Sequence, residues 1–255
     1  MRSRMLAAAL LGVSAFACKA APDGNSAAAV AAVPAQAVIL SAADGLRVHG
    51  LYYAASKPKA LILLFHQAGS SKAEYSTIAP RLRDAGYSSL AIDQRSGGDM
   101  FGSANETVGG LGRSTDYLSA IPDLESAIAW ARTKRLPIIL WGSSYSSALV
   151  FPVAARHAGE IAAVLAFSPG EYLDGRSVKD AAKHLRAPLF VTSASDPQEI
   201  AAAKEIAESA PVGLKVQFIP IHGVHGSSTL IPARNAAGAE ENWRAVLEFL
   251  SRLHL

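Results

Sequence analysis

From residue 60 to the end of the chain, short apolar runs alternate with longer segments that have a helical pattern. The runs at residues 60–65 and 161–167 contain no charged side chain, which is typical of strands buried on both faces of a sheet. Strands that alternate with helices are joined by crossover connections, so we expect a mostly parallel sheet with helices on both faces. This pattern predicts the α/β fold class.

The chain has 255 residues, half of them hydrophobic, which is enough for one sizeable core. We therefore expect a single domain over residues 37–255, opened by a hairpin around Asp44-Gly45. Eight strands are expected at residues 37–41, 48–53, 60–65, 88–92, 137–141, 161–167, 188–192 and 214–219. Helices are expected at residues 72–85, 117–134, 145–157, 177–185, 197–209 and 239–253.

The first residues have the pattern of an export signal. Arg2 and Arg4 precede an apolar stretch at residues 5–16, which is shorter than the roughly 20 residues that span a bilayer. The segment ends at Cys18, the only cysteine, and resembles a bacterial lipobox. We expect a signal peptide over residues 1–18, lipidation at Cys18, and a flexible Ala- and Pro-rich tether over residues 19–36.

This pattern predicts an exported protein of the periplasm or outer envelope, held to the membrane only by its lipid. The alternative is an ordinary secretory signal and a soluble exported protein. In either case the mature chain has no cysteine pair for a disulfide or thiolate metal site. The net charge of +3 and the scattered basic residues give no support for a nucleic-acid partner. The oligomeric state is left open.

In a parallel α/β sheet, functional residues collect at the carboxyl ends of the strands. The expected strand 137–141 is followed by the sequence Gly-Ser-Ser-Tyr-Ser, and a helix follows directly. A serine on such a tight turn projects its hydroxyl above the sheet, and small residues are needed on either side of it. Gly142 meets this need, and Ser146 stands where glycine is usual. Ser144 is therefore the candidate nucleophile.

A serine hydroxyl is a weak nucleophile and needs a base within hydrogen-bond reach. Two later loops at the same edge of the sheet offer the partners. Asp196 follows the expected strand 188–192, and both His222 and His225 follow the expected strand 214–219. The acid would orient the imidazole and stabilise its charged form.

From about residue 38 onward the chain resembles the α/β-hydrolase superfamily, near its dienelactone-hydrolase and esterase branch. The family order of nucleophile, acid and base implies the triad Ser144, Asp196 and His225. His222 is a competing base, because both histidines precede a glycine. Asp93 is the alternative acid, but it precedes the nucleophile. With Arg95, it matches a family segment that implies a structural role.

The resemblance also implies an oxyanion hole with two donors. One is the backbone N–H of Tyr145, and the other comes from the loop that begins at His66. Glycine is usual in the family where Gln67 stands, and we expect the Gln67 N–H to be the second donor. His66 is expected mainly to hold this loop.

The substrate pocket is expected to be small and covered by loops. Only about twenty residues separate the strands around the expected helix 177–185, which leaves no room for a large lid. The long loop 96–114 carries Met100, Phe101 and Asn105, which could reach over the site. The residues expected to line the pocket share a place near this edge of the sheet: His66, Met100, Phe101 and Tyr172.

These features predict a carboxylesterase-like serine hydrolase acting on a small to medium acyl substrate, with no metal or organic cofactor. The first alternative is a peptidase limited to small peptides. The second is a lipid-tethered binding protein whose hydrolase site is inactive. This alternative stays open because Gln67 and Ser146 stand where the family usually has glycine.

Overall fold

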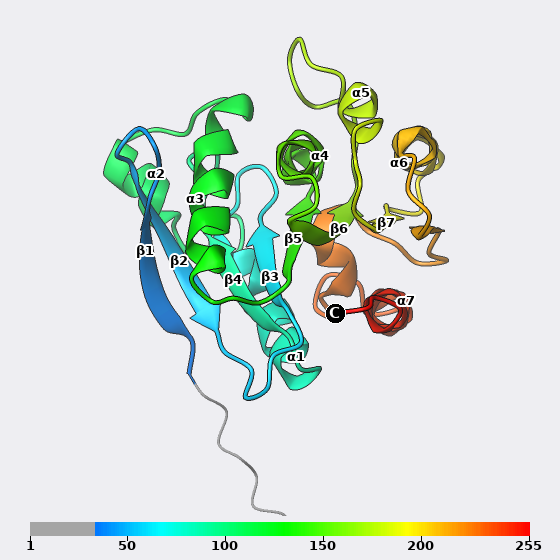
Figure 1. Cartoon of the computed structure of the whole chain (residues 1–255), viewed down its shortest axis with the longest axis horizontal. Coiled ribbons are helices and arrows are strands. Elements are labelled where there is room, and N and C mark those ends of the chain that lie inside the picture. Colours follow the sequence, from blue (N-terminus) through cyan, green and yellow to red (C-terminus); the bar gives the residue numbers. More distant parts are fainter. Residues whose placement is uncertain (1–33) are drawn as a thin grey trace, which may run out of the picture. The chain divides into compact units, whose positions relative to one another are not determined.

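The computed structural model describes residues 34–255, which form an eight-stranded sheet with helices on both faces (Figure 1). The strands are β1 (Gln36–Ser41), β2 (Arg47–Tyr53), β3 (Leu61–Phe65), β4 (Ser88–Ile92), β5 (Ile138–Ser143), β6 (Ile161–Phe167), β7 (Leu189–Thr192) and β8 (Lys215–Phe218). The α-helices are α1 (Ile78–Asp84), α2 (Glu106–Leu111), α3 (Ile121–Arg132), α4 (Tyr145–Arg156), α5 (Val178–Ala182), α6 (Pro197–Ser209) and α7 (Ala239–Ser251). Three short 3-10 helices are η1 (Lys72–Tyr75), η2 (Leu118–Ala120) and η3 (Gly226–Leu230).

The strand order is β1-β2-β4-β3-β5-β6-β7-β8. Strand β2 is antiparallel to its neighbours β1 and β4, and the remaining pairs are parallel. In the centre, Phe65 at the end of β3 lies beside Ile92 of β4 and Gly142 of β5. The loops after these strands therefore start at the same edge of the sheet. The predicted α/β-hydrolase architecture is confirmed, and the segment between β6 and β7 contains α5 rather than a lid domain.

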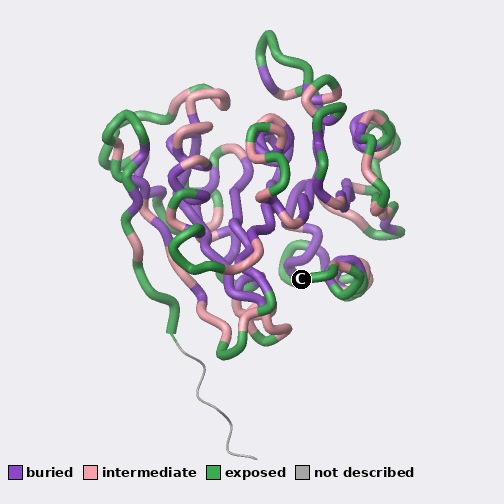
Figure 2. Tube along the Cα trace, in the orientation of Figure 1, coloured by how far each residue is buried: buried purple, intermediate pink, exposed green. Residues whose placement is uncertain are grey.

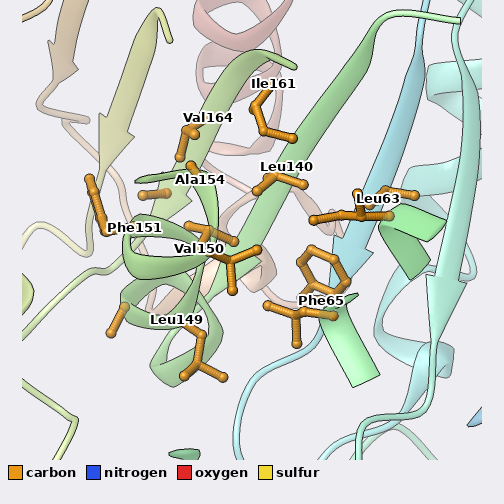
Figure 3. Packing of buried hydrophobic residues seen from close by; sticks show 14 of the residues in the cluster. Leu63, Phe65, Leu140, Leu149, Val150, Phe151, Ala154, Ile161 and Val164 are labelled. Atoms are coloured by element: carbon orange, nitrogen blue, oxygen red, sulfur yellow. The ribbon is translucent and has the colours of Figure 1, made fainter. Parts of the chain in front are cut away.

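The two faces of the sheet are covered by different helices, and buried residues follow the central strands (Figure 2). Successive side chains of a strand point to opposite faces. Leu63 and Phe65 pack with Leu149 and Val150 of α4 on one face (Figure 3). Leu64 belongs to the cluster on the other face, under α1 and α7. Burial on both faces explains why β3 needs an uninterrupted apolar sequence.

Two predicted helices begin later than the sequence pattern suggested, and both have a short 3-10 helix before them. Pro80 has no N–H to donate to the carbonyl of Ser76, and Pro122 likewise cannot bond to Leu118. The segment expected as one helix over 72–85 is therefore divided into η1 and α1, and the segment 117–134 into η2 and α3.

The loop 96–114 contains the unpredicted helix α2. The Asn105 side chain caps it by accepting a hydrogen bond from the Val108 N–H at 2.8 Å, and Gly112 ends it in the left-handed conformation. The signal peptide, Cys18 and nearly all of the predicted tether lie outside the described residues, and β1 begins at Gln36, where the tether was expected to end. Within residues 34–255, no helix has the length and apolar character needed to cross a bilayer.

Candidate active site

Ser144 lies on a tight turn between β5 and α4. Its φ of 57° is in the left-handed region, which costs free energy for a residue with a side chain. The Ser144 N–H donates to the carbonyl of Phe167 at the end of β6, at 2.8 Å. A Cβ atom on Gly142 would lie 2.4 Å from the carbonyl oxygen of Ser146. Only glycine at residue 142 lets the strand and helix approach closely enough to form this turn.

Ser146 occupies the position where the family usually has glycine, and its side chain is fully buried without a clash. Its hydroxyl donates to the carbonyl of His66 at 2.6 Å and accepts from Nε2 of Gln94 at 2.8 Å. The substitution therefore adds a connection between the nucleophile turn and the loops after β3 and β4.

His225 lies within hydrogen-bond distance of the candidate nucleophile. Its Nε2 is 2.8 Å from Oγ of Ser144, and its Nδ1 is 2.8 Å from Oε1 of Glu199. With the proton on Nδ1, the ring donates to Glu199 and can accept the serine proton at Nε2. His222 is exposed, and its carbonyl accepts from Asn235 and Asn242. The geometry brings together His225 and Ser144, and it leaves His222 in the loop.

The predicted contact between Asp196 and His225 is wrong, because Glu199 occupies that place. Asp196 is the N-cap of α6, and its carboxylate accepts hydrogen bonds from the N–H groups of Gln198 and Glu199. A side chain that caps its own helix in this way points back toward the helix axis. Glu199, one turn into the helix, is free to reach His225. Asp93, the other candidate acid, is fully buried and paired with Lys72 at 2.6 Å.

The electrostatics of the pair suit a base and its orienting acid. Burial opposes the ionisation of Glu199, but hydrogen bonds from His225, Ser168 and the Ala194 N–H outweigh it and lower the pKa of Glu199 to about 2. The hydrogen bond to Glu199 raises the pKa of His225 above its usual 6.5, although partial burial opposes this. Glu199 therefore remains a carboxylate and favours the imidazolium that forms when His225 takes a proton.

The loop after β3 does not present the Gln67 N–H to the site, contrary to the prediction. That N–H donates to Oε2 of the buried Glu74 at 2.8 Å. Among the hydrogen bonds of residues 34–255, none uses the N–H of the next residue, Ala68. The N–H of Tyr145, as the first residue of α4, has no acceptor inside the helix. The side chain of Gln67 lies near Gly226, the residue after His225, because its Oε1 would be 3.3 Å from a Cβ on Gly226.

His66 has no access to solvent, so it cannot line a substrate pocket as predicted. Its Nδ1 donates to the Gln67 carbonyl at 2.8 Å, and its Nε2 accepts from the Gln94 N–H at 3.0 Å. Burial lowers the pKa of His66, which matches a neutral ring with one donor and one acceptor. Buried Asn105 donates to the Gln94 carbonyl at 2.8 Å and so helps to hold these loops rather than covering the site.

The structural roles implied for Asp93 and Arg95 agree with their contacts. Arg95 forms a buried ion pair with Asp123, with Nη2 and Oδ1 2.7 Å apart. Asp93 accepts from the Lys72 N–H at 2.7 Å and from the Glu106 N–H at 2.8 Å. Both residues therefore connect segments around the site to one another.

Of the remaining predicted pocket residues, Met100 lies nearest the loop after β3. It is half-exposed, and its sulfur is 3.5 Å from Nε2 of Gln67. Tyr172 is half-buried on the acid side, where its hydroxyl donates to the Ser168 carbonyl at 3.2 Å. Phe101 packs instead under Arg234, whose guanidinium carbon is 5.0 Å from the ring centre. Met100 and Tyr172 are thus the two pocket candidates placed beside the site.

A family model described as Serine aminopeptidase, S33 matches residues 56–209, which is more than half of the chain. The chain belongs to this family. Its match spans β3 to α6 and so includes Ser144 and Glu199. A search of curated proteins found no significant match.

Solved structures of the same fold are similar over most of their length. A dienelactone hydrolase from Anabaena variabilis superposes with a TM-score of 0.68 and 18% identity, covering 86% of this chain and 98% of its own. An esterase from Pyrococcus furiosus gives 0.64 and 18%, covering 86% and 91%. Est1E from Butyrivibrio proteoclasticus, with ferulic acid bound, gives 0.63 and 15%, covering 85% and 98%. At these identities the similarity shows the α/β-hydrolase fold.

Three residues of the site were missed by sequence reasoning: Glu199, Glu74 and Ser168. For Glu199 a signal was available, since Asp196 followed by Pro197, with Glu199 as the third helical residue, is a helix-start pattern that assigns Asp196 to capping. Ser168, with a φ of 55°, accepts from the Gly226 N–H at 2.9 Å and hydrogen-bonds Glu199. No local pattern distinguishes Ser168 or Glu74.

Proposed function

We propose that this chain is a serine hydrolase that cleaves carboxylic esters of small to medium size through an acyl-enzyme. The observation that carries the proposal is the continuous hydrogen-bonded series from Ser144 Oγ to His225 to Glu199, with both distances 2.8 Å. A nucleophile, base and orienting acid in this geometry are the requirements of acyl transfer.

In the proposed reaction, Ser144 Oγ attacks the ester carbonyl while His225 Nε2 takes its proton. Glu199 stabilises the resulting imidazolium. The backbone N–H groups of Tyr145 and Ala68 would donate to the oxyanion, with Ala68 taking the place first predicted for Gln67. The imidazolium then protonates the leaving alcohol. A water molecule, deprotonated by His225, releases the acid from Ser144.

A small acyl group is favoured because the segment between β6 and β7 has only the five-residue helix α5. The structural relative Est1E binds ferulic acid, an aromatic acid of modest size. Met100 and Tyr172 would contact the substrate. Efficient hydrolysis of long-chain triglyceride emulsions would contradict this size limit.

The test compares wild type with Ser144→Ala on short p-nitrophenyl esters. We expect kcat/KM to fall by about 10⁵-fold or more, because the nucleophile is lost. Ser228→Ala is the matched control, since Ser228 lies on η3 beside the site and should retain wild-type activity. A fluorophosphonate probe should label wild type but not Ser144→Ala. A folded wild-type protein that the probe does not label would instead favour the inactive binding protein.

Peptidase activity is the second candidate, because the matched family is described as Serine aminopeptidase, S33. Aminoacyl p-nitroanilides assayed beside the esters separate the two. A higher kcat/KM for the anilides than for the esters would show that the chain is a peptidase and not an esterase.

We also propose export and lipidation at Cys18, on the sequence pattern of residues 1–18. Radiolabelled palmitate should enter the wild-type protein and be lost in Cys18→Ser. An unlabelled wild type in the soluble fraction would point to ordinary secretion.

A further inference from the structure

Glu74 is a fully buried carboxyl group beside the site, and the proposed reaction does not use it. Its side chain has no exposed surface. Within residues 34–255 it forms no ion pair with lysine or arginine, because Lys72 on the same turn is bound to Asp93 and Glu106. A buried carboxyl without a cation costs free energy and needs hydrogen-bond donors.

The donors come from both walls of the proposed oxyanion hole. Oε2 of Glu74 accepts from the Gln67 N–H at 2.8 Å, and Oε1 accepts from the Ser143 hydroxyl at 2.6 Å. Gln67 directly precedes Ala68, and Ser143 directly precedes Ser144. The two oxygens of one carboxylate thus join the two loops from which the proposed oxyanion donors come.

The loop that carries His225 is also connected to the Glu74 carboxylate, through Ser143. The Ser227 N–H donates to Ser143 Oγ at 2.8 Å, and Ser227 lies two residues after His225. Since Ser143 Oγ accepts from Ser227, its single proton is available to Glu74. If Glu74 were protonated at Oε2, its proton would face the Gln67 N–H, and if at Oε1, the Ser143 hydroxyl would have to turn its own proton away from the carboxyl group. The arrangement is complete when Glu74 is ionised.

We propose that Glu74 is a positioning residue, whose ionised carboxylate holds the loop after β3 against the nucleophile turn and so fixes the spacing of the oxyanion donors. This inference rests on the proposed hydrolase function. Glu74 does not touch the substrate, so its loss should lower kcat more than it raises KM.

Burial raises the pKa of Glu74 to about 7, although hydrogen bonds from Ser143, Gln67 and Ser70 oppose the rise. The titratable groups that act on it electrostatically are His225, whose charge lowers the pKa of Glu74, and Tyr75, which burial keeps neutral. As the pH falls through about 7, Glu74 gains its proton, and one of its two acceptor contacts must reverse or break. The acid limb of the activity profile should therefore contain two ionisations, those of Glu74 and His225.

The experiment compares Glu74→Gln and Glu74→Ala with the matched control Glu248→Gln, an exposed glutamate on α7. The readouts are kcat, KM, the pH profile and the rate of fluorophosphonate labelling. We expect kcat of Glu74→Ala to fall by about 10–100-fold with little change in KM, somewhat less than removal of an oxyanion donor itself. Glu74→Gln has nearly the same shape, so it remains informative if Glu74→Ala does not fold. Its acid limb should retain only the ionisation of His225.

The connection predicts non-additivity with Ser143→Ala. The losses of kcat in Glu74→Ala and Ser143→Ala should be less than additive in the double variant, because both changes break the Glu74–Ser143 contact, while Ser143→Ala also removes the acceptor of the Ser227 N–H. Wild-type kcat and an unchanged pH profile in folded Glu74→Gln, with labelling of Ser144 intact, would overturn this inference alone. Absence of Ser144-dependent labelling in wild type would overturn the proposed function and this inference with it.

Discussion

The turn that carries Ser144 and the helix start that carries Glu199 supply two ends of the same hydrogen-bonded series, but they are built differently. The Ser144 turn is buried, has a strained φ of 57°, and leaves no space for a side chain at Gly142. The start of α6 is an exposed helix end with two carboxylates, Asp196 and Glu199, three residues apart. Steric contact allows only glycine at residue 142, and this places Ser144 without an alternative. The start of α6 instead offers two acids, and hydrogen bonds decide which of them contacts His225.

Among the variants that bear on this comparison, the largest expected effect tests the assignment of the acid. Glu199→Gln should lower kcat/KM by about 10³–10⁴-fold, because an uncharged amide cannot stabilise the imidazolium. Asp196→Asn, the matched control on the same helix, should remain within about threefold of wild type, because asparagine is also a good N-cap. A greater loss in Asp196→Asn than in Glu199→Gln would show that Asp196 is the functional acid.

Next in size is the steric limit at the nucleophile turn. Gly142→Ala should destabilise the fold by about 1–3 kcal/mol, because its Cβ would overlap the Ser146 carbonyl and force the helix away from the strand. Thermal unfolding and ester hydrolysis measure the two effects. Gly213→Ala is the control, since a Cβ there meets nothing within 4 Å. Equal melting temperatures and activities for both variants would contradict the steric argument.

A smaller effect concerns pH. His225 acts as a base only when neutral, and Glu199 raises the pKa of His225, so activity should fall as the pH drops through that raised value. In Glu199→Gln the support for the imidazolium is removed, and the acid limb of the remaining activity should move to lower pH. The profile of kcat/KM on a short ester measures the shift. An acid limb that stays in place or moves up would show that Glu199 does not act on His225.

The smallest expected effect is on stability at the helix start. Asp196→Ala should lower the free energy of unfolding by about 1 kcal/mol, because the N–H groups of Gln198 and Glu199 lose their acceptor. Denaturant unfolding measures it, and Asp196→Asn should restore most of the loss. Equal free energies of unfolding for Asp196→Ala and wild type would contradict the assignment of the cap.

The sequence by itself determined the parts of this protein that depend on local pattern. Short runs rich in apolar residues located the eight strands, and α6 has the predicted bounds, because its capping residue and Pro197 are adjacent in the chain. Gly142 and the strand-to-helix turn likewise indicated Ser144 from neighbouring residues alone. The two displaced helix starts follow from Pro80 and Pro122, which are themselves local signals in the sequence.

The tertiary structure alone decided which groups from distant segments share hydrogen bonds. Asp196 and Glu199 both lie near the loop of His225, and the choice between them depends on whether a carboxylate turns to its own helix or across 26 residues of chain to the imidazole. In the same way, the Gln67 N–H donates to Glu74 and is therefore not available to an oxyanion. A backbone N–H has one proton to donate and a buried polar group needs a partner, so these assignments follow from the full set of contacts around the site. These contacts join segments that are far apart in the sequence, so no single segment shows them.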